Sequence, residues 1–251
     1  MFDTHAHLAD GRFNEDRAQV IERALKAKVK EILCICCDAK ELSVFWQALS
    51  SYPFIWLAAG IHPHDASKYK EMRKMLEPAL KTKRFCALGE IGLDYHYMNS
   101  PREIQKEVFK AQLKFAREKD LPVIVHTREA AEDAWRILKY EGVRETVIHC
   151  FSGEKKELER YLELGFYVSF AGMITFPSAS SLRNLVSLVP LDKLLLETDC
   201  PYLAPQAVRG RRNEPAFVRH TMEEIARIRH IPPEELSEIT TQNARMLFRI
   251  N

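Results

Sequence analysis

Eight short apolar runs recur along this chain, and amphipathic stretches separate them. The runs cover residues 1–2, 31–36, 54–59, 85–89, 122–125, 146–148, 166–171 and 193–197. They are continuously apolar rather than alternating, which is typical of parallel strands that are covered on both faces. Eight strand–helix units in 251 residues favour an α/β fold, a single (β/α)8 TIM barrel that forms one domain over residues 1–251. An open doubly wound sheet accommodates the same alternation.

Several residues predict where the helices begin and end. Ser100 opens the motif SPRE, a capping box with proline at the first helical position. Asn14 is placed to cap the helix that follows it. Gly142 stands where a helix should end before the sixth strand. Two further helices, around 216–228 and from 233, could close one end of the barrel.

Charge and cysteine usage limit the function classes. Lys and Arg number 37 against 35 Asp and Glu, so the net charge of +2 lacks the field of a protein that coats nucleic acid. Cys34, Cys36 and Cys37 crowd into one run, which favours free thiols in a reducing compartment over disulfides. We see no signal peptide and no apolar run near the roughly 18 residues of a membrane span. The sequence therefore predicts a cytoplasmic protein without membrane association or an obligate protein partner.

Polar side chains gather just after the predicted strands. They are His5, His7, His62, His64, Glu90, Asp94, His126, His149 and Asp199. In the N-terminal motif FDTHAH, the alternation of an extended chain directs Asp3, His5 and His7 to one side. Any one of these histidines could be an ordinary core or surface residue. The C-terminal ends of barrel strands converge on one mouth, however, so their joint placement predicts a metal site there.

This donor set is larger than one ion needs. A catalytic zinc typically takes about three protein ligands, and these residues suit two divalent ions. Zn, Mn, Co, Fe and Mg are the candidates, and nitrogen donors favour the others over Mg. We expect Glu90 to bridge the ions, with His5, His7 and Asp199 on one and His126 and His149 on the other. Cys150 and Cys200 are expected to pack outside the mouth, because adjacent strand residues face opposite ways.

Motifs along almost the whole chain resemble those of the TatD family of metal-dependent hydrolases, within the wider amidohydrolase-like barrels. They are DTHAH, GIHPH, GEIGLDY, VIVHTREA, HCFSG and LLETDCPYLAP…RGRRNEP, in this order. The resemblance implies a (β/α)8 barrel with a two-metal centre whose ligands are His5, His7, Glu90, His126, His149 and Asp199. Many amidohydrolases bridge their metals with a carboxylated lysine. Here Glu90 takes that position, so the bridge needs no carbon dioxide.

Two ions about 3.5–4 Å apart suit in-line displacement at phosphorus by an activated water. Asp199 is the candidate proton acceptor, and His62 is placed to contact the phosphate or the leaving group.

The unpatterned segment 200–215 carries a cluster that could hold phosphates or form a solvated turn: Arg209, Arg211, Arg212 and Asn213. The resemblance adds Arg128 as a substrate contact, although it could pair with a nearby carboxylate. Tyr95 and Tyr202 could stack on a base or pack at the rim.

The residues themselves indicate a two-metal hydrolase, in the first place a phosphoesterase. The resemblance implies a deoxyribonuclease of DNA catabolism that trims single-stranded DNA or 3′ ends in the 3′-5′ direction. One alternative is a metal-dependent deacylase of misacylated tRNA or another ester hydrolase, because the same water could attack a carbonyl carbon. An alternative of another class is a noncatalytic, metal-stabilised nucleic-acid-binding protein.

Overall fold

The computed structural model describes residues 1–250, with the side chains of residues 71, 72 and 75 left aside. Eight parallel strands form one sheet in sequence order, each hydrogen-bonded to the next. The strands are β1 (Phe2–Ala6), β2 (Glu31–Cys36), β3 (Ile55–Ala59), β4 (Phe85–Asp94), β5 (Val123–Arg128), β6 (Thr146–Ile148), β7 (Tyr167–Phe170) and β8 (Leu194–Leu196). Every apolar run of the sequence thus contributes a strand.

The sheet closes into a barrel where β1 meets β8 and the residues that follow it. Asp199 N–H donates a hydrogen bond to the His5 carbonyl (2.9 Å), and His7 N–H donates to the Cys200 carbonyl (2.8 Å). The Thr4 hydroxyl donates to the Leu196 carbonyl at 2.9 Å. These bonds rule out the open doubly wound sheet. The predicted (β/α)8 barrel is confirmed.

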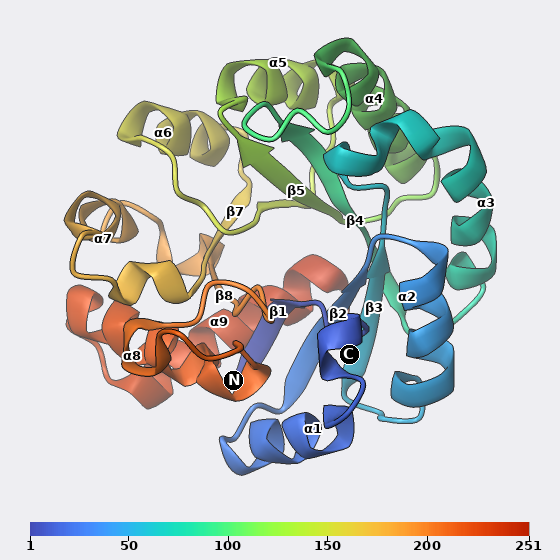
Figure 1. Cartoon of the computed structure of the whole chain (residues 1–251). Helices are drawn as coiled ribbons and strands as arrows, with labels where there is room; N and C mark the ends of the chain where they lie inside the picture. The colour runs from blue at the N-terminus through green and yellow to red at the C-terminus, as the bar shows by residue number, and fades with distance from the viewer. Residues whose placement is uncertain (251) are drawn as a thin grey trace.

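Helices form a ring around the strands (Figure 1). The ring contains α1 (Arg17–Lys26), α2 (Ala39–Val44), α3 (Tyr69–Leu80), α4 (Arg102–Glu118), α5 (Ala131–Glu141), α6 (Lys155–Glu163), α7 (Ser180–Val186) and α8 (Val218–Arg229), and the last helix of the chain is α9 (Pro233–Phe248). Both helices expected after residue 215 are present as α8 and α9. Within the described part of the chain, no helix has the length and apolar character needed to cross a bilayer.

The strands place apolar side chains in two cores. The inner core fills the barrel and takes one face of each strand, as with Leu33, Ile124 and Leu195. Leu247 and Phe248 of α9 belong to this inner core, so α9 closes the end of the barrel that lies behind the strands in Figure 1. The outer core packs the other face of the strands against the helices. Burial on both faces explains why the strands are continuously apolar.

Two predicted helix starts are wrong, because side chains expected to cap a helix bond elsewhere. α4 begins at Arg102, and the Ser100 hydroxyl donates to the carbonyl of His64 at 2.9 Å instead of capping it. α1 begins at Arg17, and the Asn14 side chain accepts a hydrogen bond from the Arg17 guanidinium at 2.8 Å. The predicted helix end at Gly142 is confirmed, since this residue has a φ of 65° after α5.

Gly92 lets β4 approach β5 closely beside the barrel mouth. Its φ is 143°, and a Cβ at this position would lie 1.9 Å from the His126 carbonyl oxygen. We expect Gly92→Ala to lower the free energy of unfolding by about 1–3 kcal/mol, because the added methyl must push two strands apart. Urea unfolding measures the change. Gly11→Ala is the control, since its Cβ would have its nearest neighbour at 3.8 Å, and equal losses in both variants would contradict the explanation.

Candidate metal centre

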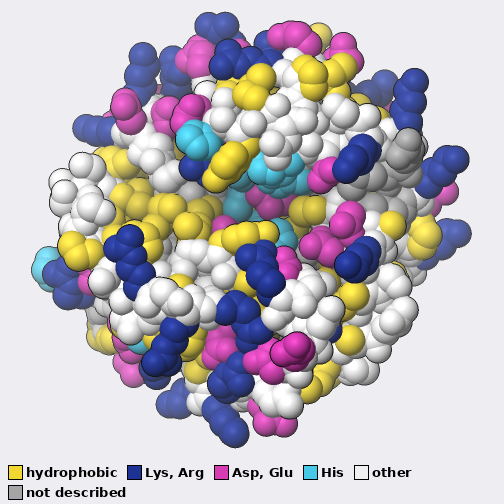
Figure 2. Space-filling model, viewed as in Figure 1, with side chains coloured by type: hydrophobic (Ala, Val, Ile, Leu, Met, Phe, Trp, Pro, Cys, Tyr) yellow, Lys and Arg dark blue, Asp and Glu magenta, His cyan; other side chains and the backbone are white. Residues whose placement is uncertain are grey.

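The C-terminal ends of the strands open into one cavity of about 670 Å³. Figure 2 shows this hollow from the same side as Figure 1, with histidine and acidic side chains gathered in it. Side chains predicted as ligands or catalytic groups line it: His7, His62, Glu90, His126, His149 and Asp199. His5 is completely buried. The structure therefore brings the predicted groups from distant strands to one place.

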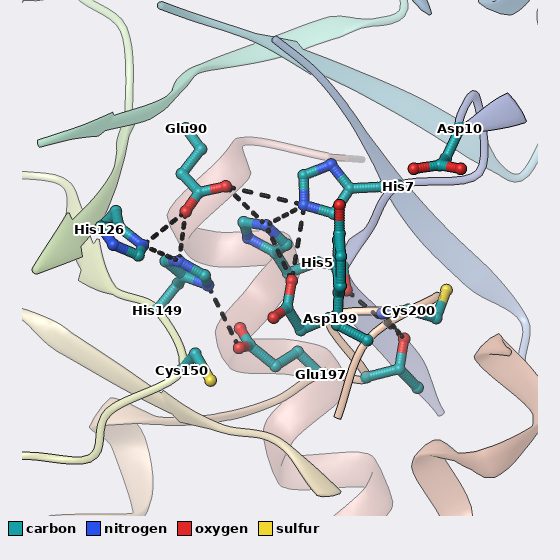
Figure 3. Close-up of polar contacts among 12 residues, drawn as sticks. His5, His7, Asp10, Glu90, His126, His149, Cys150, Glu197, Asp199 and Cys200 are labelled. Atoms are coloured by element: carbon teal, nitrogen blue, oxygen red, sulfur yellow. Dashed lines mark hydrogen bonds and ion pairs between the residues drawn. The ribbon is translucent and has the colours of Figure 1, made fainter. Parts of the chain in front are cut away.

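Glu90 lies between two groups of imidazoles (Figure 3). Its Oε1 is 2.7 Å from His149 Nε2 and 2.8 Å from His126 Nδ1. Its Oε2 is 3.3 Å from His5 Nε2 and 3.7 Å from His7 Nε2. Each carboxylate oxygen thus faces a different pair of histidines, which is the arrangement that a bridging ligand requires. That Glu90 bridges two ions stays a prediction.

Asp199 completes the group formed by the two N-terminal histidines. Its Oδ1 is 3.5 Å from His7 Nε2 and 3.7 Å from His5 Nε2. The backbone holds it there in a left-handed conformation with a φ of 56°. Its N–H also donates to the His5 carbonyl, so the bonds that close the barrel set the position of this carboxylate.

Asp3 does not join the cluster, contrary to the expectation for the N-terminal motif. The pairing of β1 with β2 shifts register between Asp3 and Ala6, which interrupts the alternation of an ideal strand. The Asp3 carboxylate instead accepts hydrogen bonds from the N–H (2.9 Å) and hydroxyl (2.6 Å) of Thr198. Burial raises the pKa of Asp3 to about 8. This residue anchors the segment that carries Asp199.

The histidines after β3 lie on the other side of the cluster. His62 Nε2 is 3.4 Å from Glu90 Oε1. His64 Nε2 is 3.0 Å from Asp94 Oδ2, and the same oxygen is 3.1 Å from His126 Nε2. His126 therefore contacts one carboxylate through each ring nitrogen, which fixes the orientation of its ring.

Burial and close contact shift the pKa values of these groups. Burial opposes charge on Glu90, but the neighbouring imidazoles outweigh it and hold the pKa of Glu90 well below its usual range. Burial also opposes charge on His149, yet Glu90 and Glu197 raise its pKa well above the usual value. For His7, burial lowers the pKa, but the hydrogen bond to Asp199 together with the charges of Asp199 and Glu90 outweighs burial and raises the pKa to about 9. Glu90 is therefore ionised at neutral pH, as a metal ligand must be.

Glu197 is a site residue that the sequence reasoning missed. It is fully buried, and its Oε1 lies 3.3 Å from His149 Nδ1, the nitrogen that does not face Glu90. The Ser169 hydroxyl donates to Glu197 Oε2 at 2.5 Å and fixes the carboxylate. A carboxylate behind a ligating histidine orients the ring and raises its basicity. The motif LLLETD held the signal, since Glu197 follows Leu195 of β8 by two residues, and the alternation of a strand directs both side chains into the barrel.

The donor atoms of the cluster fit metal ions. In each of three groups, one donor atom per residue lies within 4.8 Å of the others: His5, His7 and Glu90; His62, Glu90 and His126; His5, His149 and Glu197. The ring nitrogens His5 Nε2 and His7 Nε2 face each other at 3.3 Å, and a cation can accept a lone pair from both. Imidazole and carboxylate donors are those that Zn, Mn, Fe and Co share.

Two of the predicted phosphate-binding residues hold the loop itself. Asn213 is fully buried, and its amide donates to the carbonyls of Thr198 (2.9 Å) and Tyr202 (2.6 Å). The Arg212 guanidinium forms an ion pair with Asp16 at 2.7 Å. The structure does not place either side chain among those that line the cavity.

The other predicted contacts lie nearer to solvent. Arg128 lines the cavity, and its guanidinium lies 4.8 Å from the centre of the Tyr97 ring. Arg209 lies 4.7 Å from the centre of the Phe176 ring, and Arg211 is exposed. Among the predicted arginines, Arg128 is therefore the one that borders the cavity.

Of the two tyrosines considered for base stacking, only Tyr202 is placed for it. Tyr202 lines the cavity with 47% of its surface exposed, and the Arg12 guanidinium lies 4.2 Å from its ring centre. Tyr95 is buried, and its hydroxyl donates to Asp133 at 2.8 Å. No sequence pattern indicated Arg12, because it lies nearly two hundred positions from Tyr202 in the chain.

The two cysteines beside predicted ligands behave differently from each other. Cys200 is fully buried, as expected for a residue that packs outside the mouth. Cys150 instead lines the cavity, so the expectation for this residue is wrong. β6 ends at Ile148, and Cys150 has a φ of 46°, so the alternation of a strand does not reach it.

Comparison with known proteins gives a consistent family. Residues 2–249 match a family model described as TatD related DNase. The chain is 41% identical to a Bacillus subtilis protein named an uncharacterized metal-dependent hydrolase, over 100% of both chains. It is 36% identical to a Rahnella protein named 3′-5′ ssDNA/RNA exonuclease TatD, over 100% of this chain and 99% of the other. The crystal structure of a TatD homologue from Escherichia coli K12 superposes with a TM-score of 0.94, at 30% identity, over 100% of this chain and 98% of that one.

The contact between Glu197 and His149 leads to a prediction about metal affinity. We expect Glu197→Gln to weaken metal binding by about 10- to 100-fold. The neutral amide of the glutamine cannot raise the basicity of the His149 ring as the Glu197 carboxylate does. Competition with a chromogenic chelator measures the affinity. Glu31→Gln is the control, since Glu31 is also buried and ion-paired but lies at the start of β2, at the other end of the barrel. Equal affinities in the parent protein and Glu197→Gln would contradict this role.

Proposed function

This chain belongs to the family of TatD-related DNases and metal-dependent hydrolases, and on that premise we propose that it is a 3′-5′ deoxyribonuclease. It hydrolyses phosphodiester bonds of single-stranded DNA or of 3′ ends, with two divalent metal ions and an activated water. Residues 1–251 act as one catalytic domain in DNA catabolism. The cytoplasm is the proposed compartment, because all six cysteines are free thiols.

The position of the Glu90 carboxylate carries this proposal. One of its oxygens faces His126 and His149, and the other faces His5 and His7. His5, His7 and Asp199 would hold one ion, His126 and His149 the other, and Glu90 both. When bound, such a pair of ions stabilises charge on the phosphate oxygens and lowers the pKa of water.

Asp199 and His62 act on the substrate side of this centre. Both side chains line the cavity. His62 follows β3 and Asp199 follows β8, whereas Glu90 lies on β4. Asp199 retains a partly exposed side chain, at 15%, and is the proposed acceptor of the proton from the attacking water. His62, with 14% of its side chain exposed, is proposed to hydrogen-bond to the phosphate or to the leaving oxygen.

Arginine–aromatic pairs at the rim support a single-stranded substrate. Arg128 covers Tyr97 at 4.8 Å from guanidinium to ring centre, and Arg12, which is ion-paired with Asp10 at 2.7 Å, covers Tyr202 at 4.2 Å. Exposed aromatic rings stack on unpaired bases, and guanidinium groups bind phosphate through paired hydrogen bonds. A few such local contacts are what a protein with a net charge of +2 needs in order to hold a polyanion.

Loss of the Glu90 charge tests the proposed chemistry. We expect Glu90→Gln to lower DNA hydrolysis by about 100- to 1000-fold, because a bridging carboxylate is worth several kcal/mol of metal-assisted stabilisation. The assay follows single-stranded DNA labelled at its 3′ or 5′ end, with added Mg²⁺, Mn²⁺ or Zn²⁺. Glu129→Gln is the control, since this carboxylate is exposed and bonded to His96 outside the cluster.

The same assay, run beside one on misacylated tRNA and a DNA-binding measurement, separates the alternatives. Unchanged hydrolysis by Glu90→Gln would contradict the role of the carboxylate. Release of the amino acid from misacylated tRNA, with DNA ends intact, would favour the deacylase. DNA binding by the metal-loaded parent protein without turnover would favour the noncatalytic binding protein.

Removal of the Tyr202 ring tests the proposed substrate path. We expect Tyr202→Ala to raise the KM for single-stranded DNA by about 10- to 100-fold with little change in kcat, because stacking on one base is worth about 1–3 kcal/mol. Tyr140→Ala is the matched control, since Tyr140 is 85% exposed on α5 and does not line the cavity. An equal KM for the two variants would contradict stacking at the rim.

A further inference from the structure

A second set of metal-ligating side chains adjoins the candidate centre. A ring nitrogen of His7, Sγ of Cys37 and a carboxylate oxygen of Glu41 all lie within 4.8 Å of one another. All three residues line the main cavity, so an ion from solvent can reach them. Cys37 is a free thiol. Neither Cys37 nor Glu41 has a role in the proposed hydrolysis.

The fold holds Cys37 and Glu41 in place. Leu33 and Ile35 of β2 point into the barrel, and the same two-residue alternation directs Cys37 to the mouth. Asp38 caps α2 by accepting a hydrogen bond from Glu41 N–H at 2.7 Å. Glu41 Oε2 in turn accepts a hydrogen bond from Cys37 N–H at 2.6 Å. This bond uses one carboxylate oxygen and keeps the carboxylate beside the thiol.

We propose that Cys37, Glu41 and His7 form a binding site for a thiophilic divalent cation such as Zn²⁺, Co²⁺ or Cd²⁺. Sulfur, nitrogen and oxygen donors together are typical of zinc-type ions, whereas Mg²⁺ and Mn²⁺ prefer oxygen. The cation forms a bond to the Cys37 sulfur, and the thiol proton is released to solvent. Water from the cavity supplies the remaining coordination position.

This site is coupled to the candidate centre through His7. His7 also belongs to the group with His5 and Glu90, and its Nε2 lies 3.5 Å from Asp199 Oδ1. A cation held by Cys37 and Glu41 therefore competes for a ligand of that centre. We expect excess zinc to inhibit the enzyme and excess Mg²⁺ or Mn²⁺ not to do so. The inhibition rests on the proposed function, whereas the binding of the cation does not.

Titration of the full chain with Co²⁺ tests the binding directly. A thiolate ligand produces a sulfur-to-cobalt charge-transfer band in the near ultraviolet. We expect the parent protein to show this band and to bind one more equivalent of Co²⁺ than Cys37→Ser, which lacks the band. Cys86→Ser is the matched control and keeps the band, because this half-buried thiol bonds to the Leu57 carbonyl in the barrel wall. A band of equal strength in Cys37→Ser would overturn the proposal.

A second variant keeps the test decisive if Cys37→Ser does not fold. Glu41→Gln retains an oxygen for Cys37 N–H but loses the charge, and we expect the affinity for the thiolate-bound Co²⁺ to fall at least about tenfold. An unchanged affinity would overturn the proposal.

In the DNase assay, the zinc concentration that halves the rate should rise at least about tenfold in Cys37→Ser. A protein without DNase activity that still shows the band would support this site while contradicting the proposed function.

Discussion

The hydrogen bonds that join the first strand to the segment after the last one determine whether a metal centre can exist in this chain. Asp199 N–H bonds to the His5 carbonyl, and His7 N–H bonds to the Cys200 carbonyl. Asp3 and Thr198, which lie 195 residues apart, reinforce this junction from within the barrel wall. Contacts so distant in sequence form only when the intervening strands are in place. The group of His5, His7 and Asp199 is therefore a property of the closed barrel and of no smaller part of the chain.

Much of the fold could be predicted, because a strand that is buried on both faces appears in the sequence as a continuous apolar run. The convergence of His126, His149 and Asp199 then follows from topology, since parallel strands of a barrel share one mouth. Local patterns failed where a distant partner or an irregular backbone intervened. Ser100 bonds to the carbonyl of His64 rather than to its own helix, and the left-handed conformation of Cys150 turns it into the cavity. A sequence pattern cannot show either effect.

The loop after β8 illustrates the same limit for binding residues. A cluster of arginines indicates a phosphate site, but the pattern cannot show which guanidinium groups already have partners. The Arg212 guanidinium is ion-paired with Asp16, which lies near the other end of the chain. The Asn213 amide donates a hydrogen bond to the Thr198 carbonyl and so holds the loop. Arg128 does border the cavity, and it comes from β5 rather than from this loop. The side chains at the base of the cavity thus determine which reaction is possible. The side chains at its rim, which come from several loops, determine which substrate can bind.

The two halves of the candidate centre are held with different rigidity. His149 lies between Glu90 and Glu197, and His126 lies between Glu90 and Asp94, so each ring has a carboxylate at both nitrogens. His5 differs, because its Nδ1 has no hydrogen-bond partner among the described residues. Its ring is held by stacking on His149, with the ring centres 4.0 Å apart. Glu197 and Asp94 therefore orient the rings of His149 and His126, and His5 lacks such support among the described residues. The group that includes His5 and His7 is also the one that Cys37 and Glu41 adjoin.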